Sequence, residues 1–167
     1  MSPKLRLFLP CFLVLFLADC TSKQLVEEAL AVPHVPHEVL GETVRLTLAY
    51  NPGAALGIWL GPWSRPGLIL IGAGVLSLLT TMLVRAAPTA RLQVVALGLV
   101  MGGAVGNLRD RLTSPRGVVD FIDVGIGSAR FYTFNVADAG IFLGALLLAW
   151  ALWREDAERE AALEEAA

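Results

Sequence analysis

Long apolar stretches, separated by shorter polar segments, dominate the pattern of the chain. A bilayer core is about 30 Å thick and a helix rises about 1.5 Å per residue, so roughly 20 apolar residues can cross it. The pattern predicts membrane spans at residues 5–25, 68–84, 92–108 and 136–153, followed by a charged tail at 154–167. We therefore predict an α-helical membrane protein with four transmembrane helices in a single domain, residues 1–167.

The segment between the first two spans has a different pattern. Apolar and polar side chains alternate over residues 42–50, which is typical of a strand, and an Asn-Pro-Gly turn signal follows at 51–53. Trp59 and Trp63 are placed to lie at a membrane interface, where aromatic side chains are enriched. We predict that residues 34–63 form a small, partly β extracytoplasmic element on the membrane surface.

The first span also begins like a secretory signal peptide, with a basic start, an apolar run and Cys20. Asp19 stands where a lipoprotein cleavage site requires a small residue, and the helical pattern continues past Cys20, so a retained span fits better. Asp19 and Lys23 are four residues apart and can pair on one helix face. That pair lies either at the membrane interface or on a polar wall facing the bundle interior.

Small residues form a stripe on the third span. Gly98, Gly102 and Gly106 recur every four residues, so on a helix they share one smooth face. Such a face allows another helix to approach closely. We predict close helix packing along it.

The even number of predicted spans determines which segments lie on the same side of the membrane. Both termini and residues 85–91 must be on one side of the membrane, and residues 34–66 and 109–135 on the other. The polar ends of the first, third and fourth spans therefore converge on one membrane face. Basic residues beside the first span and in the 85–91 loop favour cytoplasmic termini, which places this convergence at the outer leaflet.

Composition narrows the classes of function. The chain is 56% hydrophobic and 17% charged, whereas a soluble domain has about a quarter of its residues charged. The net charge of −2 does not favour nucleic acid as a partner. The two cysteines have no well-placed histidines beside them, so we expect no metal site and no cofactor.

Two aspartates in apolar surroundings, Asp120 and Asp138, are the candidates for chemistry. An ionisable group beside a membrane span is a functional candidate, because burying its charge is costly. Asn135 and Asp138 have the spacing of a capping box, and the helix start favours an ionised Asp138. The apolar setting of Asp120 favours its protonated form. We expect Asp138 as initial base and Asp120 as initial acid in water activation, unless Asp138 is only a capping group.

Other functions stay open from the residues alone. A small transporter or channel would use the two aspartates as an ion or proton relay, and a scaffold would need no chemistry. A relay spreads carboxylates through the depth of its spans, whereas the second, third and fourth spans carry none in mid-helix. This pattern favours a hydrolytic site near the membrane surface. The next candidates for a catalytic carboxylate are Asp110 and Asp123.

The chain resembles the lipoprotein signal peptidase family, also called signal peptidase II, over nearly its whole length. Five motifs in this order carry the resemblance: Asp19…Lys23, Asn51-Pro-Gly-Ala-Ala-Leu-Gly57, Gly102-Gly-Ala-Val-Gly-Asn107-Leu-Arg-Asp110-Arg111, Val118-Val-Asp120-Phe121 and Phe134-Asn135-Val-Ala-Asp138. The resemblance implies an aspartic endopeptidase, multi-pass in the bacterial plasma membrane. It implies removal of signal peptides from prolipoproteins, with cleavage on the N-terminal side of the diacylglyceryl-modified cysteine.

The resemblance also implies roles for individual residues. Asp120 and Asp138 match the catalytic dyad. The positions that match substrate-binding or supporting residues are Asn51, Gly53, Asn107, Arg111 and Asn135, and those that match a structural polar cluster are Asp19, Lys23 and Asp110. The implied partners are diacylglyceryl-modified prolipoproteins, membrane lipid and, as an inhibitor, the peptide antibiotic globomycin.

Two positions depart from the family's pattern. Leu56 stands where the family often has phenylalanine, and Ala139 follows Asp138 where serine is usual. We expect these changes to affect substrate preference rather than activity. The substrate's acyl chains stay in the bilayer, so we also expect an apolar cleft reached from lipid, with the 34–63 element as a lid.

Overall fold

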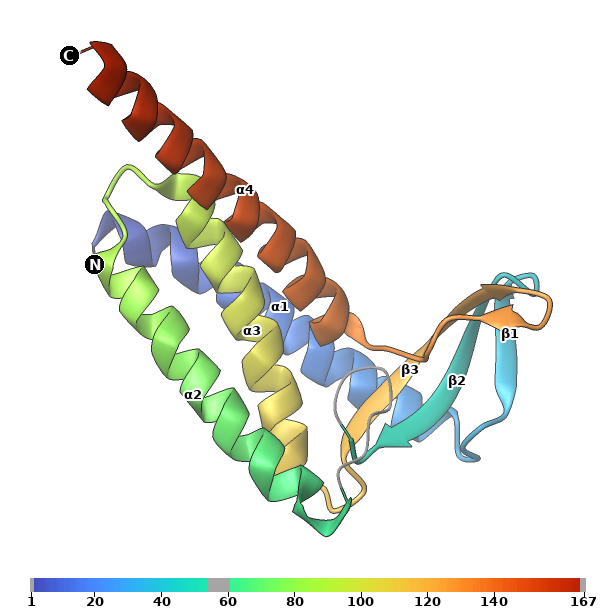
Figure 1. Ribbon diagram of the computed structural model, residues 1–167. Helices are drawn as coiled ribbons and strands as arrows, with labels where there is room; N and C mark the ends of the chain where they lie inside the picture. The colour runs from blue at the N-terminus through green and yellow to red at the C-terminus, as the bar shows by residue number, and fades with distance from the viewer. Residues whose placement is uncertain (1, 54–60, 166–167) are drawn as a thin grey trace.

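Four long helices form the body of the molecule (Figure 1). The computed structural model describes residues 2–53 and 61–165. Within them the helices are α1 (Pro3–Ala29), α2 (Ser64–Arg85), α3 (Arg91–Thr113) and α4 (Val136–Glu165). Each is long and apolar enough to span a membrane, which confirms the four predicted spans. The helices extend beyond the predicted limits, and the charged tail continues α4 as helix.

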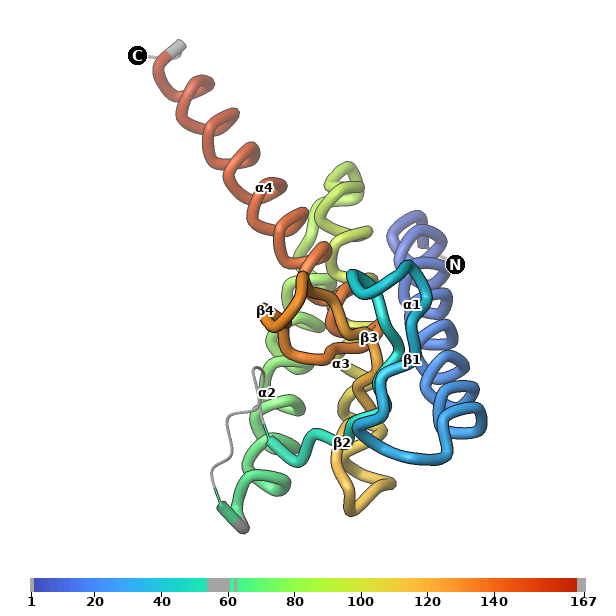
Figure 2. Tube along the Cα trace, turned by 90° about the vertical axis from the view of Figure 1, so that its right-hand side faces the viewer, coloured from blue at the N-terminus to red at the C-terminus, as the bar shows by residue number. Residues whose placement is uncertain are grey.

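Both described ends of the chain lie on the side of the bundle away from the sheet (Figure 1). The last turns of α4 project beyond the other helices in both views (Figures 1 and 2). This projecting part carries the charged residues of the 154–164 segment, which are exposed. A segment rich in Glu and Arg is therefore held away from the apolar part of the bundle.

α3 is the central helix, packed against α1, α2 and α4. Its glycine stripe faces α1, because a Cβ on Gly102 would lie 2.7 Å from the Phe12 carbonyl oxygen. On another face, a Cβ on Gly103 would lie 2.5 Å from the carbonyl oxygen of Ala137 in α4. The predicted close packing is confirmed, and the backbones of both neighbouring helices approach α3 at glycine.

A four-stranded antiparallel sheet extends sideways from the end of the bundle (Figure 1). Its order is β1-β2-β3-β4, with bounds Pro36–Leu40, Val44–Asn51, Val118–Ile126 and Ala129–Arg130. The strand predicted over residues 42–50 is confirmed as β2. The sequence pattern predicts neither β1 nor β3 as a strand, and β3 pairs with β2 across a long sequence separation.

A cluster of buried hydrophobic side chains fixes the sheet to the bundle. Leu48 of β2 and Val119 and Phe121 of β3 pack against Val26 and Leu30 at the end of α1. All five side chains are buried. Burying such a side chain contributes about 1.5–3 kcal/mol, so this contact is a major part of what positions the sheet.

One irregularity interrupts the pairing of β2 with β3. Arg45 lies opposite Asp123, and Ala49 lies opposite Asp120. Between these two pairs β2 has one residue more than β3, which makes a β-bulge. The bulge lies directly before the part of β2 that faces Asp120.

Trp63 ends a short 3₁₀ turn, Gly61–Trp63, that leads into α2. Its side chain is largely exposed, and its place at the membrane interface stays a prediction. Trp59 and Leu56 lie outside the described residues.

We predict that Gly102→Ala destabilises the protein, because the new Cβ meets backbone rather than a movable side chain. Overpacking of this kind costs about 1–3 kcal/mol, so the thermal unfolding temperature in detergent falls. Gly74→Ala is the matched control, since a Cβ there meets nothing within 4 Å and α2 gains a better helix former. Equal unfolding temperatures for the two variants would contradict the packing role of the stripe.

Candidate active site

Polar side chains from five elements meet where the sheet joins the bundle. Their hydrogen bonds and ion pairs connect them into one cluster, as the span count predicts. The members are the side chains of Asp19, Lys23, Asn51, Asn107, Asp110, Arg111, Asp120, Asn135 and Asp138, together with the backbone of Gly53. They come from α1, the end of β2 and its following turn, α3, β3 and the start of α4.

Asp120 is the third residue of β3 and is buried, with 3% of its surface exposed. Its Oδ1 accepts a hydrogen bond of 2.7 Å from Asn135 Nδ2, and its Oδ2 one of 3.1 Å from Asn51 Nδ2. The pKa of Asp120 is raised from 3.8 to about 6: burial and then the nearby charge of Asp138 raise it, and they outweigh the lowering effect of the two amides and of Lys23. This carboxyl therefore holds a proton more firmly than an ordinary aspartate.

Asp138 lies in the first turn of α4, where the predicted capping box is present. The Asp138 N–H donates to Asn135 Oδ1 at 2.9 Å, and the Asn135 N–H donates to Asp138 Oδ2 at 3.3 Å. The other oxygen, Oδ1, accepts a hydrogen bond of 2.8 Å from Asn107 Nδ2. Asp138 is thus a capping group and at the same time a member of the polar cluster.

Asn135 connects the two aspartates. Its side chain is fully buried. Its Oδ1 caps α4 beneath Asp138, while its Nδ2 donates to Asp120 and also lies 3.2 Å from the carbonyl oxygen of Val119. A single amide therefore sets the relation between the strand that carries Asp120 and the helix that carries Asp138.

Arg111, in the last turn of α3, brings positive charge close to both carboxyl groups. Its guanidinium donates to the carbonyl oxygens of Asn107 and Gly53, each at 3.2 Å. Among the described residues, its buried Nε has no hydrogen-bond partner. The turn that holds Gly53 is itself fixed, because the Gly53 N–H donates to Asn51 Oδ1 at 2.9 Å.

The predicted pair of Asp19 and Lys23 is present and lies in the bundle interior rather than at the interface. Lys23 Nζ is 2.7 Å from Asp19 Oδ2 and 2.8 Å from Asp110 Oδ2, and all three side chains are buried. A Cβ on Gly106 would overlap Asp19 Oδ2, so the glycine leaves room for this carboxylate. The ion cluster lies directly beside Asn107, to which Lys23 donates a hydrogen bond of 2.9 Å.

Asp123 does not belong to this cluster. It is bound in the sheet by Arg130 at 2.7 Å, Arg45 at 3.3 Å and Thr47 at 3.1 Å. Burial alone would raise the pKa of Asp123, but the hydrogen bonds and charges of these neighbours outweigh burial and lower it. The structure therefore gives Asp123 a role in holding the strands together.

Gly117 is a residue of the site that the sequence reasoning misses. Its φ is +96°, and a Cβ there would overlap the backbone of Asn51. Only glycine allows β3 to begin this close to the residue that binds Asp120. A lone glycine before two valines was the available signal, and it is a weak one.

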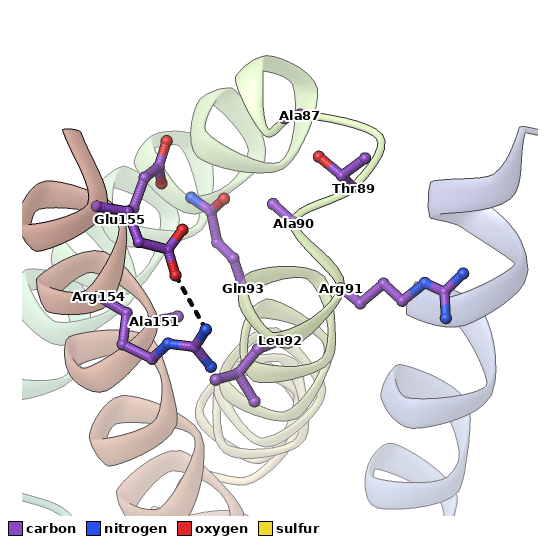
Figure 3. Close-up of a pocket in the computed structure, with 10 residues that line it drawn as sticks. Ala87, Thr89, Ala90, Arg91, Leu92, Gln93, Ala151, Arg154 and Glu155 are labelled. Atoms are coloured by element: carbon purple, nitrogen blue, oxygen red, sulfur yellow. Dashed lines mark hydrogen bonds and ion pairs between the residues drawn. The ribbon is translucent and has the colours of Figure 1, made fainter. Parts of the chain in front are cut away.

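A separate cavity of about 420 Å³ lies at the other end of the bundle, between the α2–α3 connection and α4 (Figure 3). Its lining belongs to residues 87–93 and 151–158 and includes the ion pair of Arg154 with Glu158. No member of the polar cluster lines it. The cavity is therefore distinct from the candidate site.

Comparison with known proteins matches this arrangement to one family. The family described as Signal peptidase (SPase) II matches residues 11–154. The chain belongs to the signal peptidase II family. A lipoprotein signal peptidase of Hydrogenovibrio crunogenus is 39% identical over 130 residues, which cover 77% of this chain and 70% of that protein. One of Sulfurihydrogenibium is 34% identical over 161 residues, which cover 93% of this chain and 97% of that protein.

Solved structures agree with the signal peptidase II fold. One, described as a bacterial membrane enzyme, has a TM-score of 0.80 and 27% identity and covers 90% of each chain. A second bacterial membrane enzyme has a TM-score of 0.76 and 28% identity and covers 87% of this chain and 91% of the other. The predicted fold class of four transmembrane helices with a small sheet is confirmed, in a peptidase family.

We predict that Asp120 titrates near pH 6 and that Asp138→Asn lowers its pKa, because the substitution removes a neighbouring negative charge. The measurement is the ¹³C NMR signal of aspartate carboxyls in detergent micelles, assigned by Asp120→Asn. Asp123→Asn is the control, since Asp123 is held by arginines in the sheet. A signal from Asp120 that titrates at an ordinary aspartate pKa contradicts the prediction.

Proposed function

We propose that this chain is an aspartic endopeptidase that removes signal peptides from prolipoproteins. It cleaves on the N-terminal side of the diacylglyceryl-modified cysteine. The observation that carries the proposal is that Asn135 is hydrogen-bonded to both Asp120 and Asp138. Asp120 is buried and has a raised pKa, whereas Asp138 lies at the start of a helix. The names of the curated relatives supply the substrate class.

In the proposed reaction, Asp138 takes a proton from a water molecule lying between the carboxyls. The water oxygen attacks the scissile carbonyl carbon while Asp120 gives its proton to the carbonyl oxygen. Asp138 then returns the first proton to the leaving amine as the C–N bond breaks, and Asp120 recovers its proton from the collapsing intermediate. Substrate that displaces water increases the burial of Asp120 and strengthens its hold on the proton.

Three neighbouring groups support this reaction. Asn51 and Asn135 hold the two oxygens of Asp120, and Asn107 holds one oxygen of Asp138. Arg111 Nε, which has no hydrogen-bond partner within residues 2–53 and 61–165, is the proposed donor for a substrate carbonyl oxygen. The chain thus supplies hydrogen-bond donors for both carboxyls and for the substrate.

The position of the cluster suits a lipid-anchored substrate. The cluster lies at one end of four membrane-spanning helices, beside the sheet, and the termini lie at the other end (Figure 1). With cytoplasmic termini, the carboxyls are at the outer leaflet of the bacterial plasma membrane. Acyl chains on the modified cysteine remain in the bilayer and hold the scissile bond at that depth. Globomycin is expected to compete for the same site.

We predict that Asp120→Asn and Asp138→Asn each reduce cleavage of a lipidated prolipoprotein at least about 1,000-fold, because each removes one of two acid–base groups. Asp123→Asn is the matched control: the same change three residues along β3, outside the cluster. Folding of each variant is checked by thermal unfolding in detergent. Full activity in either dyad variant would refute the dyad.

The rate of cleavage is expected to depend on pH. Asp120 must be protonated to act as the acid, so kcat/KM falls as the pH rises through about 6, the pKa of Asp120 in the free enzyme. The measurement is kcat/KM in mixed micelles from pH 4 to about 8. A flat profile over this range contradicts proton sharing.

A further inference from the structure

Lys23 has an unusual set of neighbours for a lysine within a membrane span. Only 3% of its side chain is exposed. Its Nζ lies 2.7 Å from Asp19 Oδ2, 2.8 Å from Asp110 Oδ2 and 2.9 Å from Asn107 Oδ1. An ammonium group has three hydrogens to donate. Two are matched by carboxylates, and the third is directed at a neutral amide that in turn contacts Asp138.

The contact with Lys23 decides which end of the Asn107 amide faces Asp138. Oδ1 accepts from Lys23 Nζ and from Asn135 Nδ2, at 2.9 and 3.2 Å, so that Nδ2 is left to donate to Asp138 Oδ1 at 2.8 Å. The two ends of an amide have nearly the same size, so packing does not distinguish them. A flipped amide would set its NH₂ against the ammonium and its oxygen against a carboxylate, and both contacts are repulsive.

The same ion cluster also holds the backbone beside Asp138. Asp19 Oδ1 accepts a hydrogen bond of 2.9 Å from the N–H of Ala137, one of the unpaired donors at the start of α4. Gly103 allows the carbonyl of Ala137 to approach α3 closely. The first turn of α4 is therefore tied to α1 through a group that is ion-paired with Lys23.

We propose that Lys23 is a positioning residue for the dyad: it orients the Asn107 amide so that it donates to Asp138, and thereby holds that carboxyl group in one rotamer. This inference rests on the proposed function of Asp120 and Asp138. Asp19 and Asp110 hold the ammonium in place, and Lys23 itself contacts neither aspartate of the dyad by an ion pair.

The charge of Lys23 also acts on Asp120. Burial and the charge of Asp138 raise the pKa of Asp120, and the charge of Lys23 opposes them. The charged groups that face Asp120 come from three helices: Lys23 from α1, Arg111 from α3 and Asp138 from α4. Loss of the Lys23 charge alone therefore raises the pKa of Asp120 and moves the alkaline limb of the pH–rate profile to higher pH.

The test compares the double variant K23M/D110N with its parent D110N. D110N keeps the contact between Lys23 and Asn107, whereas the double variant loses it. Removing Asp110's charge with that of Lys23 leaves the ion cluster with the same net charge as in the wild type, so Asp19 alone, rather than both carboxylates, loses its ion pair with Lys23. Met fills nearly the volume of the lysine stem. Thermal unfolding in detergent reports whether both variants are folded.

We expect kcat of K23M/D110N to fall about 100-fold below that of D110N with little change in KM, because misplacement of a reacting group costs about this much. The ¹⁵N signals of the Asn107 side-chain amide should shift, and the alkaline limb of the pH–rate profile should move upward. A loss of unfolding temperature with unchanged kcat, amide signals and pH profile would show a purely structural role and overturn the proposal.

A second variant covers failure of the double variant to fold. Asn107→Asp keeps an oxygen for Lys23 but removes the donor to Asp138, and it is expected to lose kcat to a similar extent; wild-type kcat in this variant overturns the proposal. The proposed function has its own readout. If Asp120→Asn cleaves normally, the dyad is wrong, yet the amide and Asp120 NMR signals still report whether Lys23 orients Asn107.

Discussion

The side-chain amide of Asn135 is the interaction on which the geometry of this site depends. One group at the end of the bundle is bonded at once to the cap of α4, to Asp120 on β3 and to Asn107 on α3. It is fully buried, so a lost partner is not replaced by water and costs about 1–3 kcal/mol. The positions of β3, α4 and the Asn107 amide of α3 are therefore coupled. A small displacement of one of them would strain its hydrogen bond to Asn135.

Glycine makes this polar assembly compatible with an apolar bundle. Gly103 lets α3 approach α4 beside Ala137, Gly106 leaves space for Asp19, and Gly117 lets β3 begin against Asn51. Each of these contacts brings a hydrogen-bonding group within reach of a partner in another element. The short range of hydrogen bonds thus explains why the small residues gather around the charged ones.

Much of the architecture is readable from the sequence because it depends on local periodicity. Span length predicts four helices, and their even number predicts that Asn107 and Asp138 lie at the same membrane face. The spacing of Asn135 and Asp138 predicts the capping box, which the structure contains. The roles of Asp120 and Asp138 come from family resemblance and physical argument, and they are tested only by experiment.

The features that escape the sequence depend on contacts between distant segments. β3 does not show the alternation of an exposed strand, because its residues from Val118 to Phe121 are all buried, and its partner β2 is far away in the chain. The ion pairs of Arg45 and Arg130 with Asp123 escape the sequence for the same reason, and so does the hydrogen bond of Lys23 to Asn107. Side chains at such positions acquire their partners only when the chain folds.

The bulge in β2 has a consequence for how this protein can change in evolution. Arg45 and Ala49 are four positions apart, whereas their partners Asp123 and Asp120 are three apart, so the bulge shifts the strand's phase. Arg45 and Asn51 both have odd numbers in β2, yet Arg45 contacts Asp123 and Asn51 contacts Asp120, which are an odd and an even position of β3. The bulge makes this possible. A one-residue deletion at the bulge would shift the register of β2 against β3 and move the side chains on one side of it to the opposite face of the sheet. The length of β2 before Asn51 is therefore constrained.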